Sequence, residues 1–286
     1  MNIPHSNHLV GWIGDDFTGS AASLEVLAFA GIPSVLFLSV PSKAQMELFP
    51  KAQAIGVATT ARSQSPDWMQ LHLPEYFKFL KDLSPVISHY KVCSTLDSSP
   101  EIGSIGCALD IAQSIFNSPW IPVLIAAPKM GRYQIFGHLF AASGSQVYRL
   151  DRHPTMRNHP ITPMQESDVA KHLMLQSTHK IHNLRLDTLS GKRADFATLP
   201  IATGGQVVTL DAVTDQDMAR LGKFIWQTGQ NGLFAIGSQG IQYALVEHWR
   251  ENGLIETQDR CVSAGPVEQV ICVSGSVSPQ TSDQIN

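Results

Sequence analysis

Short apolar runs alternate with longer stretches of helical periodicity along most of the chain. The runs predict β-strands over residues 8–13, 34–38, 54–58, 86–92 and 123–127. Between them, apolar residues recur on one helical face, which predicts helices over residues 20–30, 66–83 and 102–116. This alternation is typical of an α/β fold, and we expect three layers, with helices on both faces of a mostly parallel sheet.

Residues 131–163 interrupt this alternation. The segment is rich in Gly, Pro, His and Arg and has no long helical period, so it predicts loops and short strands over one end of the sheet. The alternation then resumes, with helices predicted over residues 168–177, 215–228 and 241–252 and strands over 207–211 and 233–236.

The last residues predict a second unit of the same kind. An apolar run at residues 270–273, followed by a Gly/Ser turn, indicates one more strand and the start of a helix. We therefore divide the chain into an α/β domain (residues 1–255), a linker (256–267) and the start of a second α/β domain (268–286).

The composition argues against several classes of protein. Charged residues are 15% of the chain and the net charge is −4, so nothing favours binding to nucleic acid or to an anionic membrane surface. No apolar run approaches the roughly 18 residues of a membrane span, and the first residues lack the basic start of a signal peptide, so we expect a cytoplasmic protein. The four cysteines are scattered, which indicates neither a zinc site nor a disulfide framework.

Two adjacent carboxylates, Asp15 and Asp16, follow the first predicted strand. Ligands bind at the carboxyl ends of strands in open α/β sheets, and carboxylates there can accept hydrogen bonds from sugar hydroxyls, hold a cation or take a proton. The alternative is structural: Thr18 or Ser20 caps the next helix, and the Asp residues favour its positive end. We favour a functional role, because the pair is followed by Thr-Gly-Ser directly after a first strand.

Further polar residues follow the third and fourth predicted strands. Arg62 could pair with a carboxylate in a bidentate way, or it could be a surface residue that caps a turn. The fourth strand is followed by a loop with Lys91, Ser94, Thr95 and Asp97, and a lysine with several hydroxyls suits a polyhydroxy acid. Cys93 lies in the same loop. We interpret Cys93 as inert packing rather than a nucleophile. Since the carboxyl ends of parallel strands converge, we expect Asp16 and Arg62 to face one site, with Ser94 and Thr95 beside them.

Arginines are concentrated between residues 132 and 157, in a chain with few charged residues. Arg132 comes first, and Arg149 and Arg152 follow in the same segment. They suit an anionic ligand, with an internally paired surface loop as the alternative. The two histidines of this segment lack any usual zinc spacing, and we predict no metal-ligating residues.

In this order, the motifs resemble those of the four-carbon acid sugar kinase family. The family's opening Asp-Asp-[Phe/Leu]-Thr-Gly corresponds to residues 15–19, and its Thr-x-x-Arg corresponds to residues 59–62. Its Lys-x-Asp-Ser-Thr-Leu-Arg-Gly segment corresponds to residues 91–98, and its Gly-Ser-x-Gly helix start corresponds to residues 237–240. The opening of the family's nucleotide-binding domain corresponds to residues 275–285, so the resemblance extends over nearly the whole chain.

The resemblance implies an N-terminal acid-sugar-binding domain and a C-terminal ATP-binding domain. Phosphate would pass from ATP, accompanied by Mg²⁺, to a hydroxyl of a tetronate or oxo-tetronate. The acid-sugar site would be lined by Asp15, Asp16, Arg62, Lys91, Ser94 and Thr95, and ATP would be bound by Gly275, Ser276 and Ser278. We expect the general base to come from the Asp15–Asp16 pair. The expected partners are a sugar acid and ATP, and the oligomeric state stays open, a homo-oligomer included.

Two departures from the family pattern concern the substrate. Cys93 stands where the family has an Asp, and Asp97 stands where it has an Arg. A pocket that holds three carboxylates needs more positive charge to admit an anion, because unpaired like charges repel in a partly buried site. We expect that charge from Arg132, Arg149 and Arg152.

Length is the other departure, because family members are much longer. We therefore expect this chain to bind the substrate but to lack kinase activity by itself. One rival is a non-catalytic module that retains an acid-sugar pocket. A second rival is a metal-dependent hydrolase that uses Asp15, Asp16 and histidines.

Overall fold

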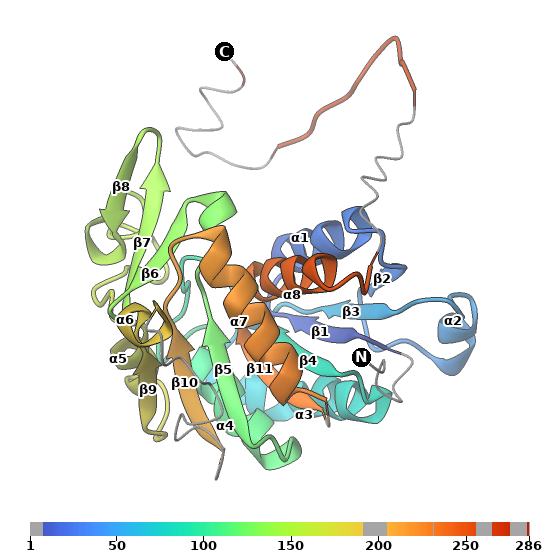
Figure 1. The fold of residues 1–286 in the computed structure, drawn as a ribbon, viewed down its shortest axis with the longest axis horizontal. Helices are drawn as coiled ribbons and strands as arrows, with labels where there is room; N and C mark the ends of the chain where they lie inside the picture. Colours follow the sequence, from blue (N-terminus) through green and yellow to red (C-terminus); the bar gives the residue numbers. More distant parts are fainter. Residues whose placement is uncertain (1–7, 191–204, 231, 256–264, 275–284, 286) are drawn as a thin grey trace.

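The computed structural model describes residues 8–190, 205–230, 232–255, 265–274 and 285, which form a central parallel sheet covered by helices (Figure 1). The sheet has eight strands in the order β2-β3-β1-β4-β11-β5-β10-β9, and every pairing is parallel. Its strands are β1 (Val10–Gly14), β2 (Ser34–Phe37), β3 (Ala54–Ala58), β4 (Ile87–Lys91), β5 (Trp120–Leu124), β9 (Ile181–Leu184), β10 (Gln206–Leu210) and β11 (Leu233–Gly237).

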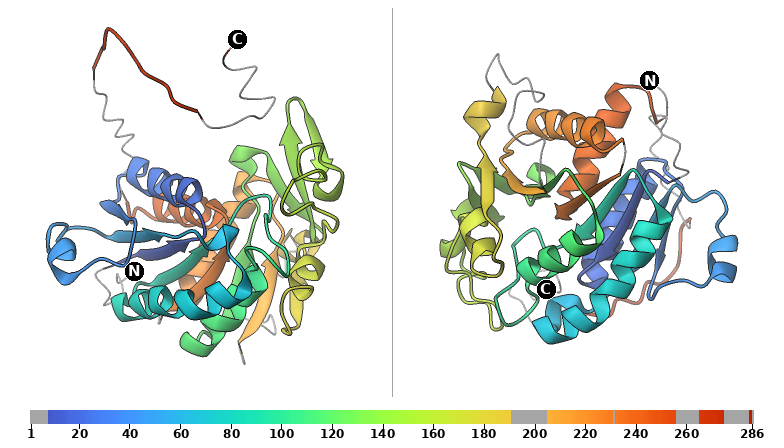
Figure 2. Two further views of the ribbon diagram at one scale, coloured as in Figure 1. Left: turned by 180° about the vertical axis from the view of Figure 1, so that it is seen from behind. Right: turned by 90° about the horizontal axis from the view of Figure 1, so that it is seen from below.

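Helices cover both faces of this sheet (Figure 2). One face carries α1 (Phe17–Phe29), α7 (Asp215–Thr228) and α8 (Gly240–Glu251), which contact one another through α8. The other face carries α3 (Pro66–Leu83), α4 (Ile105–Ile115) and α5 (Val169–Met174), which contact one another through α4. Two shorter helices, α2 (Lys43–Glu47) and α6 (Leu186–Ser190), and three 3₁₀ turns, η1 (Ala61–Ser63), η2 (Pro128–Met130) and η3 (Leu150–Arg152), complete the connections.

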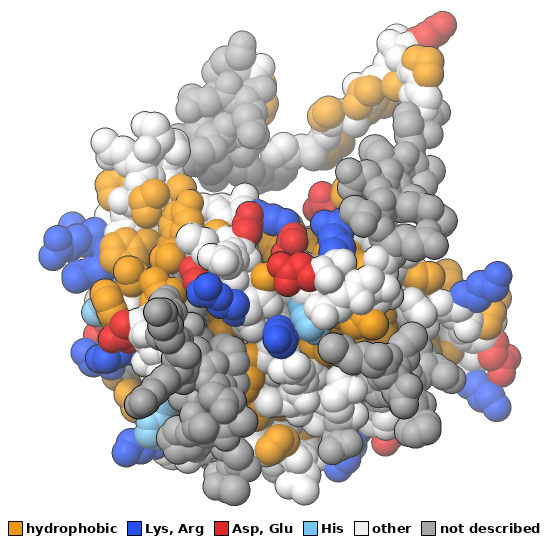
Figure 3. All heavy atoms as spheres, in the orientation of Figure 1, with side chains coloured by type: hydrophobic (Ala, Val, Ile, Leu, Met, Phe, Trp, Pro, Cys, Tyr) orange, Lys and Arg blue, Asp and Glu red, His pale blue; other side chains and the backbone are white. Residues whose placement is uncertain are grey.

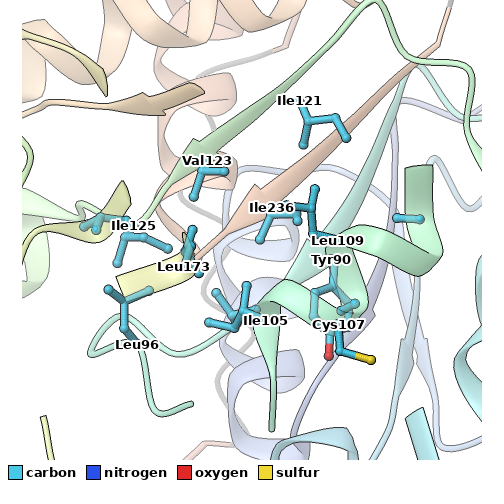
Figure 4. Close-up of a cluster of buried hydrophobic side chains, with 14 of the residues drawn as sticks. Tyr90, Leu96, Ile105, Cys107, Leu109, Ile121, Val123, Ile125, Leu173 and Ile236 are labelled. Carbon is cyan, nitrogen blue, oxygen red and sulfur yellow. The ribbon is translucent and has the colours of Figure 1, made fainter. Parts of the chain in front are cut away.

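Two hydrophobic cores lie on the two faces of the sheet, because side chains alternate along each strand. On β1, Trp12 packs in the core beneath α1 and α8, whereas Ile13 packs in the core beneath α3 and α4. Figure 4 shows part of the second core, in which Leu96 lies near Ile125 and Leu173. Strands β1, β4 and β11 in the middle of the sheet are therefore buried on both faces, as is usual in parallel sheets.

A small antiparallel sheet lies beyond the end of β5. It consists of β6 (Arg132–Ile135), β7 (His138–Ser143) and β8 (Gln146–Arg149). The carboxylate of Asp211, which is fully buried after β10, anchors this sheet by accepting hydrogen bonds from Phe136 N at 2.6 Å and Gly137 N at 3.0 Å. Hydrophobic side chains are visible over this part of the surface (Figure 3), and in the small sheet and its turn Val147 and Phe136 are more than half exposed.

The α/β fold class and its three layers are confirmed, and so is the different character of the segment after β5. The predicted ranges of β3, α3 and α7 match the observed ones, whereas β5 begins three residues earlier than predicted. The elements α2, β9 and α6 were not predicted, because four or five residues are too few to show a period. Within the described residues, no helix is long and apolar enough to cross a membrane.

The strand predicted at residues 270–273 is not formed. These residues are exposed, and Ile271 and Val273 are 90% and 94% accessible. An isolated strand is not stable because its backbone groups have no neighbouring strand to bind. The predicted ATP-binding residues Gly275, Ser276 and Ser278 lie outside the described residues, and the division into two domains and a linker stays a prediction.

Candidate functional site

Three loops meet at the carboxyl edge of the sheet, where β1, β3 and β4 end side by side. Asp15 N donates to Lys91 O at 2.9 Å, and Arg62 N donates to Asp15 O at 2.9 Å. The hydroxyl of Thr59 donates to Gly14 O at 2.8 Å. These backbone contacts fix the relative positions of the three loops, so the side chains that they carry are held in one place.

Arg62 binds both carboxylates at the start of α1. Its Nη2 and Nε donate to the two oxygens of Asp15, at 2.7 and 3.1 Å. Its Nη1 and Nη2 donate to the two oxygens of Asp16, at 2.7 and 2.9 Å. The structure thus brings Asp16 and Arg62 together as the sequence predicted, while their roles in ligand binding stay predictions.

The two carboxylates differ in burial. The side chain of Asp15 is 3% exposed, and that of Asp16 is 24% exposed. Burial raises the pKa of Asp15, and the guanidinium of Arg62 opposes this shift. Burial acts to lower the pKa of Arg62 and the Asp15 charge acts to raise it, with a net rise, so the guanidinium stays charged. Asp15 therefore binds Arg62 from the buried side of the site, and Asp16 is the more accessible of the two carboxylates.

Asp16 also begins α1, because its Oδ1 accepts a hydrogen bond from Gly19 N at 2.9 Å. The structural alternative for this motif thus holds in part, although the capping residue is Asp16 and not Thr18 or Ser20. A Cβ atom at Gly19 would lie 2.4 Å from Asp16 Oδ1 and 2.6 Å from Lys91 Nζ. A glycine is needed here because the carboxylate and the ammonium group lie against the helix backbone.

Lys91 is the last residue of β4 and is 1% exposed. Its Nζ donates to Val92 O at 2.8 Å and makes no ion pair within 4 Å among the described residues. Burial lowers the pKa of Lys91, and the charge of Asp15 opposes the shift. The ammonium group therefore has N–H bonds left over for an acceptor on a ligand.

The loop after β4 forms a chain of side-chain hydrogen bonds. The Sγ of Cys93 lies 3.0 Å from Thr95 Oγ1, and Thr95 Oγ1 donates to Asp97 Oδ1 at 2.8 Å. Ser94 is buried beside them, and its hydroxyl binds no described residue. Leu96, between Thr95 and Asp97, has a φ of +53° and is fully buried, so its side chain secures the loop to the core (Figure 4).

Cys272 is expected to react with an aromatic disulfide reagent at pH 8 long before Cys93 or Cys107. Burial raises the pKa of both Cys93 and Cys107 to about 11, whereas Cys272 is exposed. A thiol with that pKa is ionised in roughly one molecule in a thousand at pH 8, and the thiolate is the reactive form. Timed labelling followed by peptide mapping measures the order. Labelling of Cys93 as fast as Cys272 would contradict its interpretation as inert, and urea-unfolded chain, in which all thiols react, serves as the control.

Arg132 approaches the loop after β4 from the small sheet. Its Nη1 donates to Met130 O at 3.0 Å, and its Nε is buried without a partner among the described residues. Burial lowers the pKa of Arg132, and the charges of Cys93 and Asp97 oppose the shift. The structure therefore places a basic group near Cys93 and Asp97, on the loop that follows β4.

Arg149 and Arg152 are not brought to this site. Arg149 is paired across the small sheet with Phe140 and Arg132 with Ala141, so the two arginines point to opposite faces. Arg149 forms a bidentate pair with Asp151 at 2.6 and 2.7 Å, and Arg152 is exposed. Substrate binding by Arg149 and Arg152 stays a prediction. In the structure Arg149 is paired within its own loop, with Asp151.

Sequence reasoning missed a buried network that holds the loop after β4. Ser98 Oγ lies 3.0 Å from His172 Nε2 on α5, and Gln176 Nε2 donates to Ser98 Oγ at 3.0 Å. The partners are more than 70 residues apart, so only the packing of α5 against α4 brings them together. No group of three or more His, Cys, Asp or Glu in the described part of the chain could hold a metal ion.

Comparisons with known proteins agree with this architecture. Residues 10–245 match the family model described as a sugar-binding N-terminal domain. The chain is 42% identical over 280 residues to a 3-oxo-isoapionate kinase of Paraburkholderia graminis, covering 97% of this chain and 59% of that protein. It is 28% identical to a 3-oxo-tetronate kinase of Pseudomonas savastanoi pv. phaseolicola, covering 100% of this chain and 65% of that protein.

A solved structure has the same fold. A Haemophilus influenzae protein described by the family model DUF1537 superposes with a TM-score of 0.69 at 25% identity, over 83% of this chain and 55% of that one. The chain thus spans about three-fifths of the length of the curated relatives that it matches.

Proposed function

The chain belongs to the four-carbon acid sugar kinase family, and from this premise we propose that it is the substrate-binding part of an ATP-dependent sugar-acid kinase. The substrate is a four-carbon sugar acid of the tetronate or oxo-tetronate type. The observation that carries the proposal is the binding of Asp15 and Asp16 by one arginine, next to buried Lys91, at the carboxyl edge of a parallel sheet.

The charges at this site suit a ligand with both hydroxyls and a carboxylate. Lys91 and Arg132 each retain N–H donors that no described residue uses, and these bind carboxylate oxygens. Asp16 accepts hydrogen bonds from hydroxyls. Because Arg62 fixes its orientation and part of its side chain is accessible, Asp16 is also placed to take the proton of the hydroxyl that attacks phosphate.

ATP with Mg²⁺ would supply the phosphoryl group. The residues that would bind ATP lie outside the described part of the chain. Transfer requires the acceptor hydroxyl and the phosphate to be held in line. The work of this chain is therefore to bind the sugar acid, to orient one hydroxyl and to hold a proton acceptor at Asp16 Oδ2.

Calorimetry with the 286-residue chain tests the proposal. We expect threonate or erythronate to bind, and Asp16→Asn to weaken the binding about tenfold, since one charged acceptor is lost. Asp82→Asn is the matched control, because Asp82 is exposed near the end of α3 and binding should be unchanged. Absence of binding by any four-carbon polyhydroxy monocarboxylate at millimolar concentration would overturn the proposal.

A further inference from the structure

We propose that Asp97 selects the end of the ligand opposite its carboxylate: it accepts a hydrogen bond from a hydroxyl there and repels a second carboxylate. The site would then take polyhydroxy monocarboxylic acids and reject dicarboxylic acids of the same length. This inference rests on the proposed function, because it concerns the same sugar-acid site.

One oxygen of Asp97 is used and the other is open. Asp97 Oδ1 accepts the hydrogen bond from Thr95 at 2.8 Å, and Oδ2 has no partner among the described residues. The side chain is only partly buried, and no ion pair within 4 Å joins Asp97 to Arg132 in the described part of the chain. A carboxylate oxygen in this state binds hydrogen-bond donors, and the hydroxyls of a sugar acid are donors.

The hydrogen bonds around Thr95 have a fixed direction. An ionised carboxylate only accepts, so the single hydroxyl proton of Thr95 points to Asp97. The remaining contact of Thr95 must then be accepted from the S–H of Cys93, at 3.0 Å. Burial raises the pKa of Cys93 to about 11, which keeps that proton on sulfur near neutral pH. Cys93 and Thr95 together therefore hold Asp97 Oδ1 and leave Oδ2 to the ligand.

The backbone that carries Asp97 is also held firmly. Leu96 has a left-handed φ of +53°, and Ser98 Oγ donates to Leu96 O at 3.0 Å. His172 on α5 and Gln176 just after that helix bind the same Ser98 hydroxyl. A rare backbone conformation persists only where neighbouring contacts fix it, so the position of the Asp97 carboxylate is built into the fold.

The charges of the site explain why a second carboxylate is excluded. Three basic side chains balance three carboxylates around the site: Arg62 pairs with Asp15 and Asp16, the charge of Lys91 interacts with the same two, and that of Arg132 interacts with Asp97. A monocarboxylate brings one negative charge to this balanced set, near the donors of Lys91 and Arg132. A dicarboxylate would bring a second negative charge against Asp97, and like charges repel in a partly buried site.

Threonate and tartrate test this directly, because they differ in one terminal group, a hydroxymethyl in threonate and a carboxylate in tartrate. With the 286-residue chain, we expect threonate to bind at least tenfold more tightly than tartrate. Asp97→Asn removes the negative charge with little change in shape. It should therefore weaken the binding of threonate, strengthen the binding of tartrate and bring the two affinities within about threefold of each other.

Two further variants separate the charge of Asp97 from its orientation. Thr95→Val should weaken threonate several-fold because Asp97 loses its partner, and Thr95→Ser, which keeps the hydroxyl, should restore the affinity. Asp82→Asn should leave the affinity for both ligands unchanged. The thermal unfolding midpoint of each variant shows whether it is folded. If Asp97→Asn does not fold, the threonate affinity of Thr95→Val tests the role of Asp97 instead.

Each outcome is decisive. If the native chain binds threonate but Asp97→Asn keeps the same preference over tartrate, the inference is wrong and the proposed function stands. If the native chain binds tartrate as tightly as threonate, the inference is wrong as well. If it binds neither ligand nor any related sugar acid, the proposed function is wrong and the inference falls with it.

Discussion

Arg62→Ala is expected to abolish sugar-acid binding and to lower the free energy of unfolding by about 3–5 kcal/mol, the usual cost of leaving buried charges unpaired. The variant removes four hydrogen bonds to Asp15 and Asp16, whose side chains are 3% and 24% exposed. Urea unfolding measures the loss of stability, and calorimetry measures the loss of binding.

Companion variants show the cause of this effect. Arg62→Lys keeps the charge but cannot match both carboxylates at once, so we expect it to recover stability only in part. Combining Arg62→Ala with Asp15→Asn removes the buried charge, which should recover stability while binding stays absent. The control is Arg185→Ala: Arg185 pairs with Asp187 at 2.9 Å, but both side chains are more than half exposed, and exposed pairs contribute about 0–1 kcal/mol. An equal loss of stability in Arg62→Ala and Arg185→Ala would contradict the buried-pair explanation.

Acid is expected to destabilise the fold by about 4 kcal/mol between pH 7 and pH 5, through two buried histidines. Burial lowers the pKa of His89 from 6.5 to about 3 and that of His172 from 6.5 to about 4. Because the unfolded chain binds protons on these groups near pH 6.5 and the folded chain does not, stability is full above pH 6.5 and falls as the pH drops. Each histidine contributes about 2 kcal/mol of this loss at pH 5.

The contacts of His89 show why its protonation is opposed. Gln242 Nε2 lies 2.7 Å from Nδ1 of His89, and Gly237 O lies 3.0 Å from its Nε2. The amide donates to Nδ1 and the ring donates to the carbonyl, which is the neutral form of the ring. A proton added at Nδ1 would face a donor in a fully buried site.

Urea titrations at pH 7 and pH 5 measure this effect. His89→Gln and His172→Gln should each remove about half of the pH-dependent loss, whatever they do to stability at pH 7. His182→Gln is the control, because His182 is exposed at the edge strand β9 and its removal should leave the pH dependence unchanged. An unfolding free energy that is the same at both pH values would show that these rings take up protons without unfolding.

Much of the fold was predicted from the sequence because its signals are local. A parallel strand that is buried on both faces reads as an unbroken apolar run, and a helix such as α3 shows its period over eighteen residues. The meeting of Asp15, Asp16 and Arg62 was predictable for a related reason: each follows a strand, and the strands of a parallel sheet all end at one edge.

The tertiary structure alone decided how these groups divide their work. The burial of Lys91 depends on strands on both of its sides, where Gly14 and Gly237 are its register partners and add no side chains. The separation of Arg132 from Arg149 depends on the register of the small sheet, since a shift of one residue would turn every side chain to the other face. The contact of Ser98 with His172 joins residues that no local pattern connects. Periodicity fixes which residues are inside, whereas long-range register and helix docking fix which side chains face one another, and these depend on the packing of the whole chain.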